Sequence, residues 1–260
     1  MDILDRIFAQ KRVDVEQAKS ALPLSEVKAM VEDAGPTRGF HRALTESAHQ
    51  PSLIAEVKKA SPIKGVVRED FDPVEIALTY KEVGADCLSV LTDVQFFQGH
   101  PDYLAACREA SGLPVLRKDF TVDEYDIWVA RSLGADAVLL IVNGLSESQL
   151  RDYRELAESL GMDALVEAHT LKEASTALET GAKLVGINNR NLQTFETDLV
   201  TSEQTIPEIA KRATVVSESA LKSHEDIQKV SNAGARSVLI GTSFCKAPDI
   251  GAKVKEVMGW

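Results

Sequence analysis

The sequence predicts an α/β fold, a (β/α)8 TIM barrel with an N-terminal helical extension. Eight short apolar runs alternate, from about residue 52 onward, with longer segments of helical period. A Gly-Ala pair ends successive helical segments at nearly equal spacing. No G-x-G-x-x-G motif follows any of the runs, which disfavours an open dinucleotide-binding sheet. Eight strand–helix units in about 210 residues are typical of a closed barrel.

The apolar runs are rich in β-branched residues and nearly continuous, as strands of a parallel sheet are when helices cover both faces. The runs span residues 52–60, 87–93, 115–120, 137–143, 164–169, 184–189, 214–219 and 237–243. Between them, segments such as 73–84 and 123–134 place apolar residues three and four positions apart. That spacing predicts amphipathic helices packed against the strands.

Glycine marks the expected helix ends. Gly84, Gly134, Gly181 and Gly234 are each followed by alanine, and their spacings are 50, 47 and 53 residues. A glycine after the last helical turn supplies the left-handed conformation that ends a helix. A spacing near 50 residues corresponds to two successive strand–helix units.

The first 50 residues contain no strand–helix unit. Three helical patterns are expected there, over residues 2–20, 24–34 and 39–48. We therefore expect residues 1–50 to form a helical extension packed on a barrel of residues 51–260, in one domain overall.

Composition excludes several classes of protein. A chain that is 44% hydrophobic and 27% charged is typical of globular proteins and not of disordered ones. The net charge of −11 disfavours nucleic acid as a partner, because phosphate backbones bind positive surfaces. Three cysteines without ligand spacing predict reduced thiols and no metal site. No apolar stretch of 18 residues and no leader-like start are present, so we expect a cytoplasmic protein without a membrane partner.

Charged side chains near the ends of the expected strands carry the functional information. Glu56 and Lys58 share one face of the first strand, Lys118 lies near the end of the third, and Glu167 lies on the fifth. Such residues cost several kcal/mol in an apolar barrel unless they are paired. A buried ion-pair network is one interpretation. Proton-transfer chemistry is the other, with lysines that lower one another's pKa and a desolvated glutamate whose pKa is raised.

Polar residues at further strand ends extend this cluster. Asn188 closes the sixth strand and Ser219 the seventh, within the sequence SESA. The eighth strand ends in IGTS, which contains Gly241 and Thr242. In barrels, the loops after the last two strands commonly bind phosphate through backbone N–H groups and hydroxyls.

Two features of the loops allow alternative interpretations. One feature is the set of basic residues formed by Arg190 and the loop after the first strand. These residues either add positive charge near the expected phosphate or form a solvated surface. For Arg68, which lies in that loop, we favour the solvated surface. Phe97 and Phe120 follow the second and third strands. They either plug the loops or flank a flat aromatic substrate.

Taken together, these segments resemble the indole-3-glycerol phosphate synthase family. The resemblance runs from the N-terminal helices to the end of the chain, and four motifs in this order make it specific: IAEVKKASPIKG (54–65), PVLRKDF (114–120), ALVEAHT (164–170) and GINNRNLQTF (186–195). It implies ring closure of 1-(2-carboxyphenylamino)-1-deoxy-D-ribulose 5-phosphate with loss of CO₂ and water. It implies a small phosphorylated substrate, no metal and no organic cofactor.

The resemblance also implies roles for the polar residues. Lys118 matches the general acid that protonates the ribulose carbonyl oxygen, and Glu167 the base of the dehydration. Lys58 would hold the substrate carboxylate and share the acid role in the second step. Glu56 would orient the lysines and handle the departing hydroxyl, and Asn188 would bind the sugar-derived hydroxyls.

The remaining matches concern binding. The resemblance places Phe97 and Phe120 around the anthranilate ring. The phosphate and upper-loop positions correspond to Ser61, Ser219, Gly241 and Thr242, with Arg190 nearby.

Five positions depart from the family pattern. Ala220 stands where glycine is usual after Glu-Ser, and its Cβ is expected to crowd a bound phosphate. His100, Ile63 and the Phe244-Cys245 pair also differ. None replaces the expected acid, base or carboxylate-binding lysine, so we expect altered substrate affinity and retained activity.

Two other functions are compatible with a phosphate-binding barrel. A barrel isomerase acting on a phosphoribosyl amine needs a cysteine and an aspartate at strand ends, but Cys87 begins its strand. A ligand-binding barrel without catalysis is disfavoured because Lys118 and Glu167 are both present. A monomer or weak homo-oligomer is expected.

Overall fold

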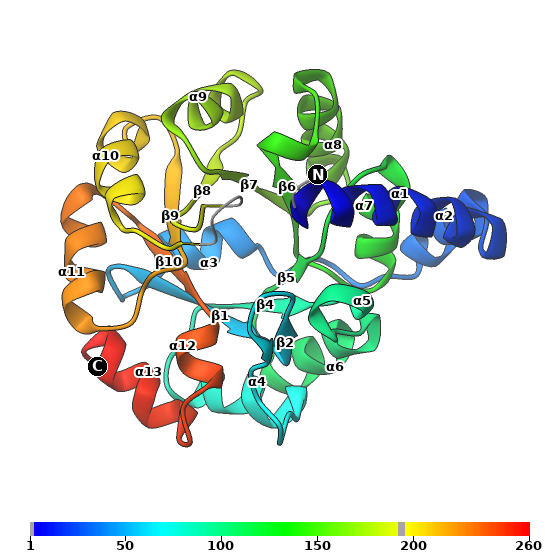
Figure 1. The fold of residues 1–260 in the computed structure, drawn as a ribbon. Coiled ribbons are helices and arrows are strands. Elements are labelled where there is room, and N and C mark those ends of the chain that lie inside the picture. The colour runs from blue at the N-terminus through cyan, green and yellow to red at the C-terminus, as the bar shows by residue number, and fades with distance from the viewer. Residues whose placement is uncertain (1–2, 192–195) are drawn as a thin grey trace.

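The computed structural model describes residues 3–191 and 196–260 (Figure 1). Residue 2 of the first expected helix and residues 192–195 of the GINNRNLQTF motif lie outside the described residues.

A closed barrel of parallel strands forms the centre of the molecule and confirms the predicted fold class (Figure 1). Its strands follow one another around the barrel in the order β1-β10-β9-β8-β7-β6-β5-β4. Each expected apolar run overlaps one of them. The strands are β1 (Ser52–Val57), β4 (Cys87–Leu91), β5 (Val115–Lys118), β6 (Ala137–Ile141), β7 (Asp163–Ala168), β8 (Leu184–Asn188), β9 (Thr214–Glu218) and β10 (Ser237–Ile240).

Helices surround the barrel, as their amphipathic patterns predict (Figure 1). They are α4 (Pro73–Glu82), α6 (Pro101–Ser111), α7 (Glu124–Ser132), α8 (Glu147–Ser159), α9 (Leu171–Glu179), α10 (Val200–Ile209), α11 (His224–Ala233) and α13 (Ile250–Met258). The glycine prediction is confirmed, because Gly84, Gly134, Gly181 and Gly234 have φ values of 92°, 86°, 89° and 110°. Side chains cap the amino ends of all these helices except α10, for example Asp72, which accepts hydrogen bonds from the first turn of α4.

The loops at the carboxyl ends of the strands contain short elements that the sequence analysis did not predict. A two-stranded hairpin of β2 (Ala60–Ser61) and β3 (Gly65–Val66) follows β1. Short helices α5 (Val94–Phe97) and α12 (Thr242–Cys245) follow β4 and β10, and the 3-10 helix η1 (Val142–Gly144) follows β6. Runs of two to four residues carry too little periodicity to be recognised in a sequence.

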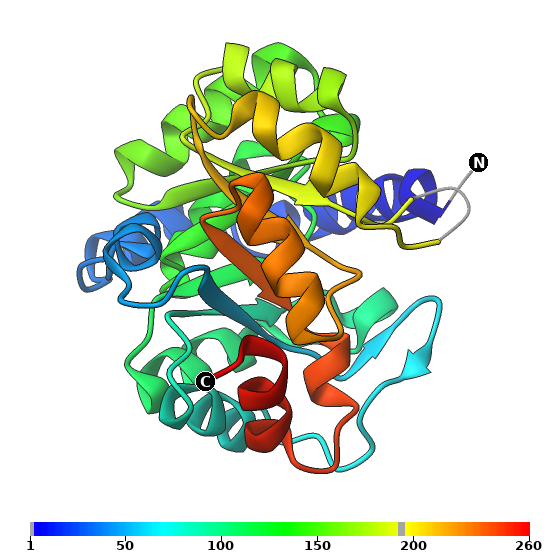
Figure 2. The same cartoon turned by 90° about the vertical axis from the view of Figure 1, so that its left-hand side faces the viewer.

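The N-terminal residues form three helices, as expected: α1 (Ile3–Ala21), α2 (Leu24–Glu32) and α3 (Phe40–Glu46). Helix α3 lies at the amino ends of the strands, where the Cys87 thiol contacts the carbonyl of Phe40 and Asp163 accepts from His41 N–H. Helix α1 lies near the carboxyl ends. The start of α1 and the β2–β3 hairpin lie at the same end of the barrel in Figure 2.

Helix α1 docks through a close aromatic contact. Phe8 is buried, and its ring occupies the space next to Gly144 in which any Cβ would overlap the ring. Leu4, Phe8 and Val15 of α1 join the side chains inside the barrel, such as Leu116 and Leu165, in one cluster. Among the described residues, no helix is both long and apolar enough to cross a membrane.

Candidate active site

Charged side chains meet inside the barrel at the carboxyl ends of its strands. The Lys118 ammonium, at the end of β5, lies 3.3 Å from Glu167 Oε2 on β7 and 3.7 Å from Glu218 Oε2 on β9. Lys58, just beyond β1, lies 3.1 Å from Glu56 Oε1. All three carboxylates are buried. The structure therefore brings together both expected acids and both expected lysines.

Glu218 is a third acid, which the sequence analysis missed. The SESA segment was interpreted there only as a phosphate loop. Strand alternation is the pattern that could have indicated it. Side chains two residues apart share one face of a strand, so Glu218 points to the same face as Val216, which packs inside the barrel. Two glycines make room for the carboxylates: a Cβ at Gly186 would overlap Glu218, and a Cβ at Gly241 would overlap Glu56.

The expected pKa shifts were wrong for two residues. Burial alone would lower the pKa of Lys118, but the surrounding Glu167, Glu218 and Glu56 outweigh burial and raise it. Burial would raise the pKa of Glu167, but Lys118, His169 and the side chain of Asn188 lower it. The reason is the pairing of Lys118 with Glu167, since Lys118 is surrounded by acids and not by another lysine.

Glu218 is the glutamate whose pKa is raised. Its pKa of about 8 results first from burial and next from the negative charge of Glu167. At neutral pH the cluster therefore contains a protonated Lys118, an ionised Glu167 and a mostly protonated Glu218. A cationic acid thus lies within hydrogen-bond distance of an ionised base.

An apolar cavity of about 130 Å³ lies on one side of this cluster. Phe97 and Phe120 line it with ring centroids 6.0 Å apart, and the Lys58 ammonium lies 5.4 Å from the centre of the Phe97 ring. The two rings thus face a cavity, as the aromatic-substrate interpretation requires. Helix α1 forms another wall with Ile3, Leu4 and Ile7, which sequence reasoning did not assign to the site.

A cationic cavity of about 340 Å³ lies on the other side. Its lining includes the predicted Arg190, Ser219, Gly241 and Thr242, together with Lys64, Lys222 and Lys246. The pKa of Lys64 is lowered by burial and then by the other cations, with Lys246 first. Gathered like charges of this kind favour binding of an anion.

The two cavities adjoin. Glu56, Lys58, Lys118, Arg190 and Thr242 line both. An elongated molecule with an aromatic ring at one end and an anion at the other would pass directly over Lys118.

Three predicted residues are placed differently from the others. Ser61 lines the apolar cavity and not the cationic one. Asn188 hydrogen-bonds Glu167 and is not among the described residues that line either cavity.

The expectation of a solvated surface at Arg68 was wrong: its side chain is 15% exposed and donates to the carbonyls of Cys245 and Ala247. Its role is to hold neighbouring loops together.

The departures from the family pattern also have defined positions. Ser219 and Ala220 line the cationic cavity with φ values of 65° and 64°, in the left-handed region. Ile63 lines the apolar cavity. His100 caps α6 by accepting from Asp102 N–H. Phe244 and Cys245 are buried in α12.

Within the part of the chain that the structure describes, no cluster of three or more His, Cys, Asp or Glu side chains has the geometry of a metal site. The fold and the paired cavities define the chain as a (β/α)8-barrel protein with a cluster of acids and lysines between an apolar and a cationic cavity.

Comparison with known proteins identifies the family. A family model described as indole-3-glycerol phosphate synthase matches residues 4–257. The chain is 47% identical over 260 residues to the indole-3-glycerol phosphate synthase of Aromatoleum aromaticum, covering 99% of each chain. It is 50% identical over 241 residues to that of Chlorobium luteolum, covering 93% of this chain and 92% of the relative. The chain therefore belongs to the indole-3-glycerol phosphate synthase family.

Solved structures agree on the fold. A tryptophan synthase α-subunit from Pyrococcus furiosus has a TM-score of 0.62 at 14% identity, covering 82% of this chain and 99% of that one. A 3-hexulose-6-phosphate synthase has a TM-score of 0.61 at 17% identity, covering 80% and 98%. At such identities the likeness concerns the barrel alone.

Proposed function

We propose that Lys118 and Glu167 are the general acid and the general base of the indole-3-glycerol phosphate synthase reaction. This carboxy-lyase reaction closes the ring of 1-(2-carboxyphenylamino)-1-deoxy-D-ribulose 5-phosphate and releases CO₂ and water. The observation that carries the assignment is the position of Lys118, next to Glu167 and on the wall that both cavities share.

The two cavities orient the substrate. The anthranilate ring enters the apolar cavity beside Phe97 and Phe120, and the phosphate enters the cationic cavity near Ser219, Gly241 and Thr242. The ribulose carbon chain then spans Lys118. Holding both ends places the reacting carbons together, which removes much of the entropic cost of ring closure.

Ring closure uses the positive charge of Lys118. The aromatic carbon that carries the carboxylate attacks the ribulose carbonyl carbon, and Lys118 Nζ transfers a proton to the carbonyl oxygen. The carbon–carboxylate bond then breaks, CO₂ leaves, and its bonding electrons restore the aromatic ring. The raised pKa of Lys118 keeps the proton available at neutral pH, and the acid acts where negative charge develops.

Dehydration uses the negative charge of Glu167. Its carboxylate removes a proton from the substrate, the carbon–carbon double bond of the new ring forms, and the hydroxyl leaves as water. Lys58 supplies the proton to that hydroxyl after holding the substrate carboxylate, and Glu56 orients Lys58 through the 3.1 Å ion pair. The amide of Asn188 bonds Glu167, and we propose that it also contacts the sugar-derived hydroxyls.

Three further expectations stay proposals. We propose that residues 1–50 are an extension of a barrel spanning 51–260, supported by the start of β1 at Ser52. We propose a cytoplasmic enzyme, supported by three buried free thiols, Cys87, Cys107 and Cys245. We also propose that it is a monomer or a weak homo-oligomer.

Indole fluorescence tests the function directly. Purified protein is mixed with the carboxyphenylamino-deoxyribulose phosphate, with and without EDTA. We expect fluorescence to rise equally in both samples. A folded protein that gives no rise would favour a barrel that binds phosphorylated ligands without catalysis, and a rise abolished by EDTA would contradict the absence of a metal.

A further inference from the structure

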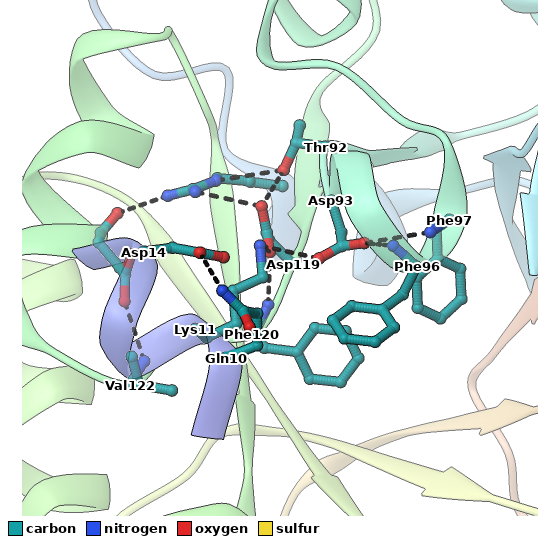
Figure 3. Close-up of polar contacts among 12 residues, drawn as sticks. Gln10, Lys11, Asp14, Thr92, Asp93, Phe96, Phe97, Asp119, Phe120 and Val122 are labelled. Carbon is teal, nitrogen blue, oxygen red and sulfur yellow. Dashed lines mark hydrogen bonds and ion pairs between the residues drawn. The ribbon is translucent and has the colours of Figure 1, made fainter. Parts of the chain in front are cut away.

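Lys11 of the N-terminal helix α1 forms an ion-pair network with two carboxylates of the barrel (Figure 3). Its ammonium lies 2.9 Å from Asp93 Oδ2 and 2.7 Å from Asp119 Oδ1. Asp93 follows β4 and Asp119 follows β5, and both carboxylates are buried. The Lys11 side chain is 14% exposed. The network therefore joins α1 to two separate loops at the carboxyl end of the barrel.

Each carboxylate in turn fixes an aromatic residue of the apolar cavity. Asp93 Oδ1 accepts from the backbone N–H groups of Phe96 and Phe97, at 2.6 and 3.1 Å. Asp119 Oδ1 accepts from the N–H of Phe120 at 2.9 Å. Figure 3 shows Lys11 between these two groups of contacts. The position of both aromatic walls thus depends on carboxylates that share one ammonium.

Charge balance makes Lys11 necessary to the network. Arg117 also pairs with Asp119, at 3.2 Å, and Thr92 donates to Asp119 Oδ2 at 2.6 Å. Lys11 is therefore the cation that contacts both carboxylates, and Arg117 contacts Asp119 alone of the two. Without Lys11, Asp93 would lose the cation that contacts it, and a buried charge that loses its partner is strongly destabilising. Rearrangement of the β4 and β5 loops is the expected relief.

We infer that Lys11 is a positioning residue for the synthase reaction, which holds Phe97 and Phe120 in place as the aromatic wall of the cavity that accepts the substrate's ring. Phe8 supports the same wall, because it lies one helical turn before Lys11 and its ring meets Phe120 edge-on, with centroids 5.8 Å apart. Through these contacts the N-terminal helix sets the shape of the apolar cavity. The inference rests on the proposed function.

The test compares Lys11→Met with a matched lysine on the same helix. Lys19 also reaches from α1 to a barrel aspartate, Asp123, at 2.8 Å, but Asp123 accepts from the N–H of Tyr125, which does not line the apolar cavity. We expect KM to rise about tenfold in Lys11→Met while kcat changes by less than about threefold, since the aromatic walls hold the ring in the ground state and the transition state alike. Lys19→Met should leave both constants unchanged, and Lys11→Arg should restore most of the affinity.

A double-mutant cycle shows whether Lys11 acts through the aromatic walls. In a Phe97→Ala/Phe120→Ala background the substitution Lys11→Met should raise KM by less than about twofold, because the groups it positions are gone. If Lys11→Met does not fold, Asp93→Asn serves in its place, since asparagine keeps an oxygen to cap α5 and loses the ion pair with Lys11.

Two results would overturn the inference: an unchanged KM in folded Lys11→Met, or an equal rise in Lys19→Met. Assaying the parent protein in parallel distinguishes failure of the positioning role from failure of the proposed synthase function. An inactive parent would refute the synthase assignment itself, whereas an active parent with an unaffected Lys11 variant would refute the positioning role alone.

Discussion

Lys118 Nζ lies 3.3 Å from Glu167 Oε2, so the proposed acid and the proposed base are each other's counter-ion. The pairing raises the pKa of the lysine and lowers that of the glutamate, against the effect of burial in both cases. Each group is therefore kept in the protonation state that its step requires. A substrate carbonyl oxygen that approaches Lys118 competes with Glu167 for its protons.

Removal of either charge should abolish most of the activity. We expect Lys118→Met and Glu167→Gln each to lower kcat by at least about 10²-fold, because acid–base groups contribute roughly that much. Circular dichroism should show that both variants are folded. Lys222→Met, on the wall of the cationic cavity, is the control: it should raise KM with kcat within about threefold of the parent. An unchanged kcat in either cluster variant would refute that residue's role.

The raised pKa of Glu218 predicts how stability depends on pH. Between the ordinary glutamate value of 4.5 and about 8, the folded protein holds a proton that the unfolded chain has lost. The free energy of unfolding should therefore fall as pH rises through this window, by up to about 1.4 kcal/mol per unit. Glu218→Gln should lack this slope.

Urea unfolding of Glu218→Gln and the parent at several pH values from 5 to 8.5 would measure the difference. The variant should gain stability relative to the parent as pH rises, and the difference should level off above pH 8. Parallel curves for the two proteins would show that Glu218 does not hold the proton.

Ala220 offers a test of backbone strain. Its φ of 64° costs a residue with a Cβ about 1–2 kcal/mol relative to glycine, which adopts this region freely. After subtracting the extra chain entropy of glycine, Ala220→Gly should stabilise the protein by about 0.5–1 kcal/mol. Because Ala220 lines the cationic cavity, KM should also fall.

The matched control for Ala220 is Ala105→Gly, at an exposed position inside helix α6. It should destabilise the protein by about 1 kcal/mol and leave KM unchanged. Thermal unfolding and initial rates measure both effects. A loss of stability in Ala220→Gly would contradict the strain.

The contact with Glu56 requires glycine at position 241. A Cβ at this position would overlap both the carboxylate and the Cβ of Glu56, so a rotation of the carboxylate alone cannot relieve the contact. Gly241→Ala should displace Glu56 from Lys58 and lower kcat/KM by about tenfold or more. Gly35→Ala is the control, since nothing lies within 4 Å of a Cβ there. Equal kinetics in the two variants would refute the requirement for glycine.

The sequence predicted the barrel because its signals are local and repeated. Strand runs and the glycines that end the helices recur along the chain, and the four Gly-Ala pairs have the expected left-handed φ. The short hairpin of residues 60–66 was missed because two-residue strands leave no periodic pattern.

The candidate site was predicted in part. Residue types at strand ends indicated Glu56, Lys118 and Glu167, but their pKa shifts depend on which neighbours surround each group in space. The pairing of Lys118 with Glu167 reverses both expected shifts, and Glu218 raises the pKa of Lys118 further. Lys11 gave no signal, because a lysine on a polar helical segment has the same pattern whether it meets solvent or two buried aspartates.

The two steps of the reaction provide the most direct test of the assigned roles. Release of CO₂ and formation of the indole ring of the product are measured in parallel, in single turnovers of Lys118→Met and Glu167→Gln. We expect Lys118→Met to slow both, because ring closure precedes decarboxylation. Glu167→Gln should release CO₂ at a rate near that of the parent and form indole slowly, because only dehydration needs the base. Release of CO₂ by Lys118→Met at the parent's rate, or an equal loss of both products in Glu167→Gln, would contradict the assignment.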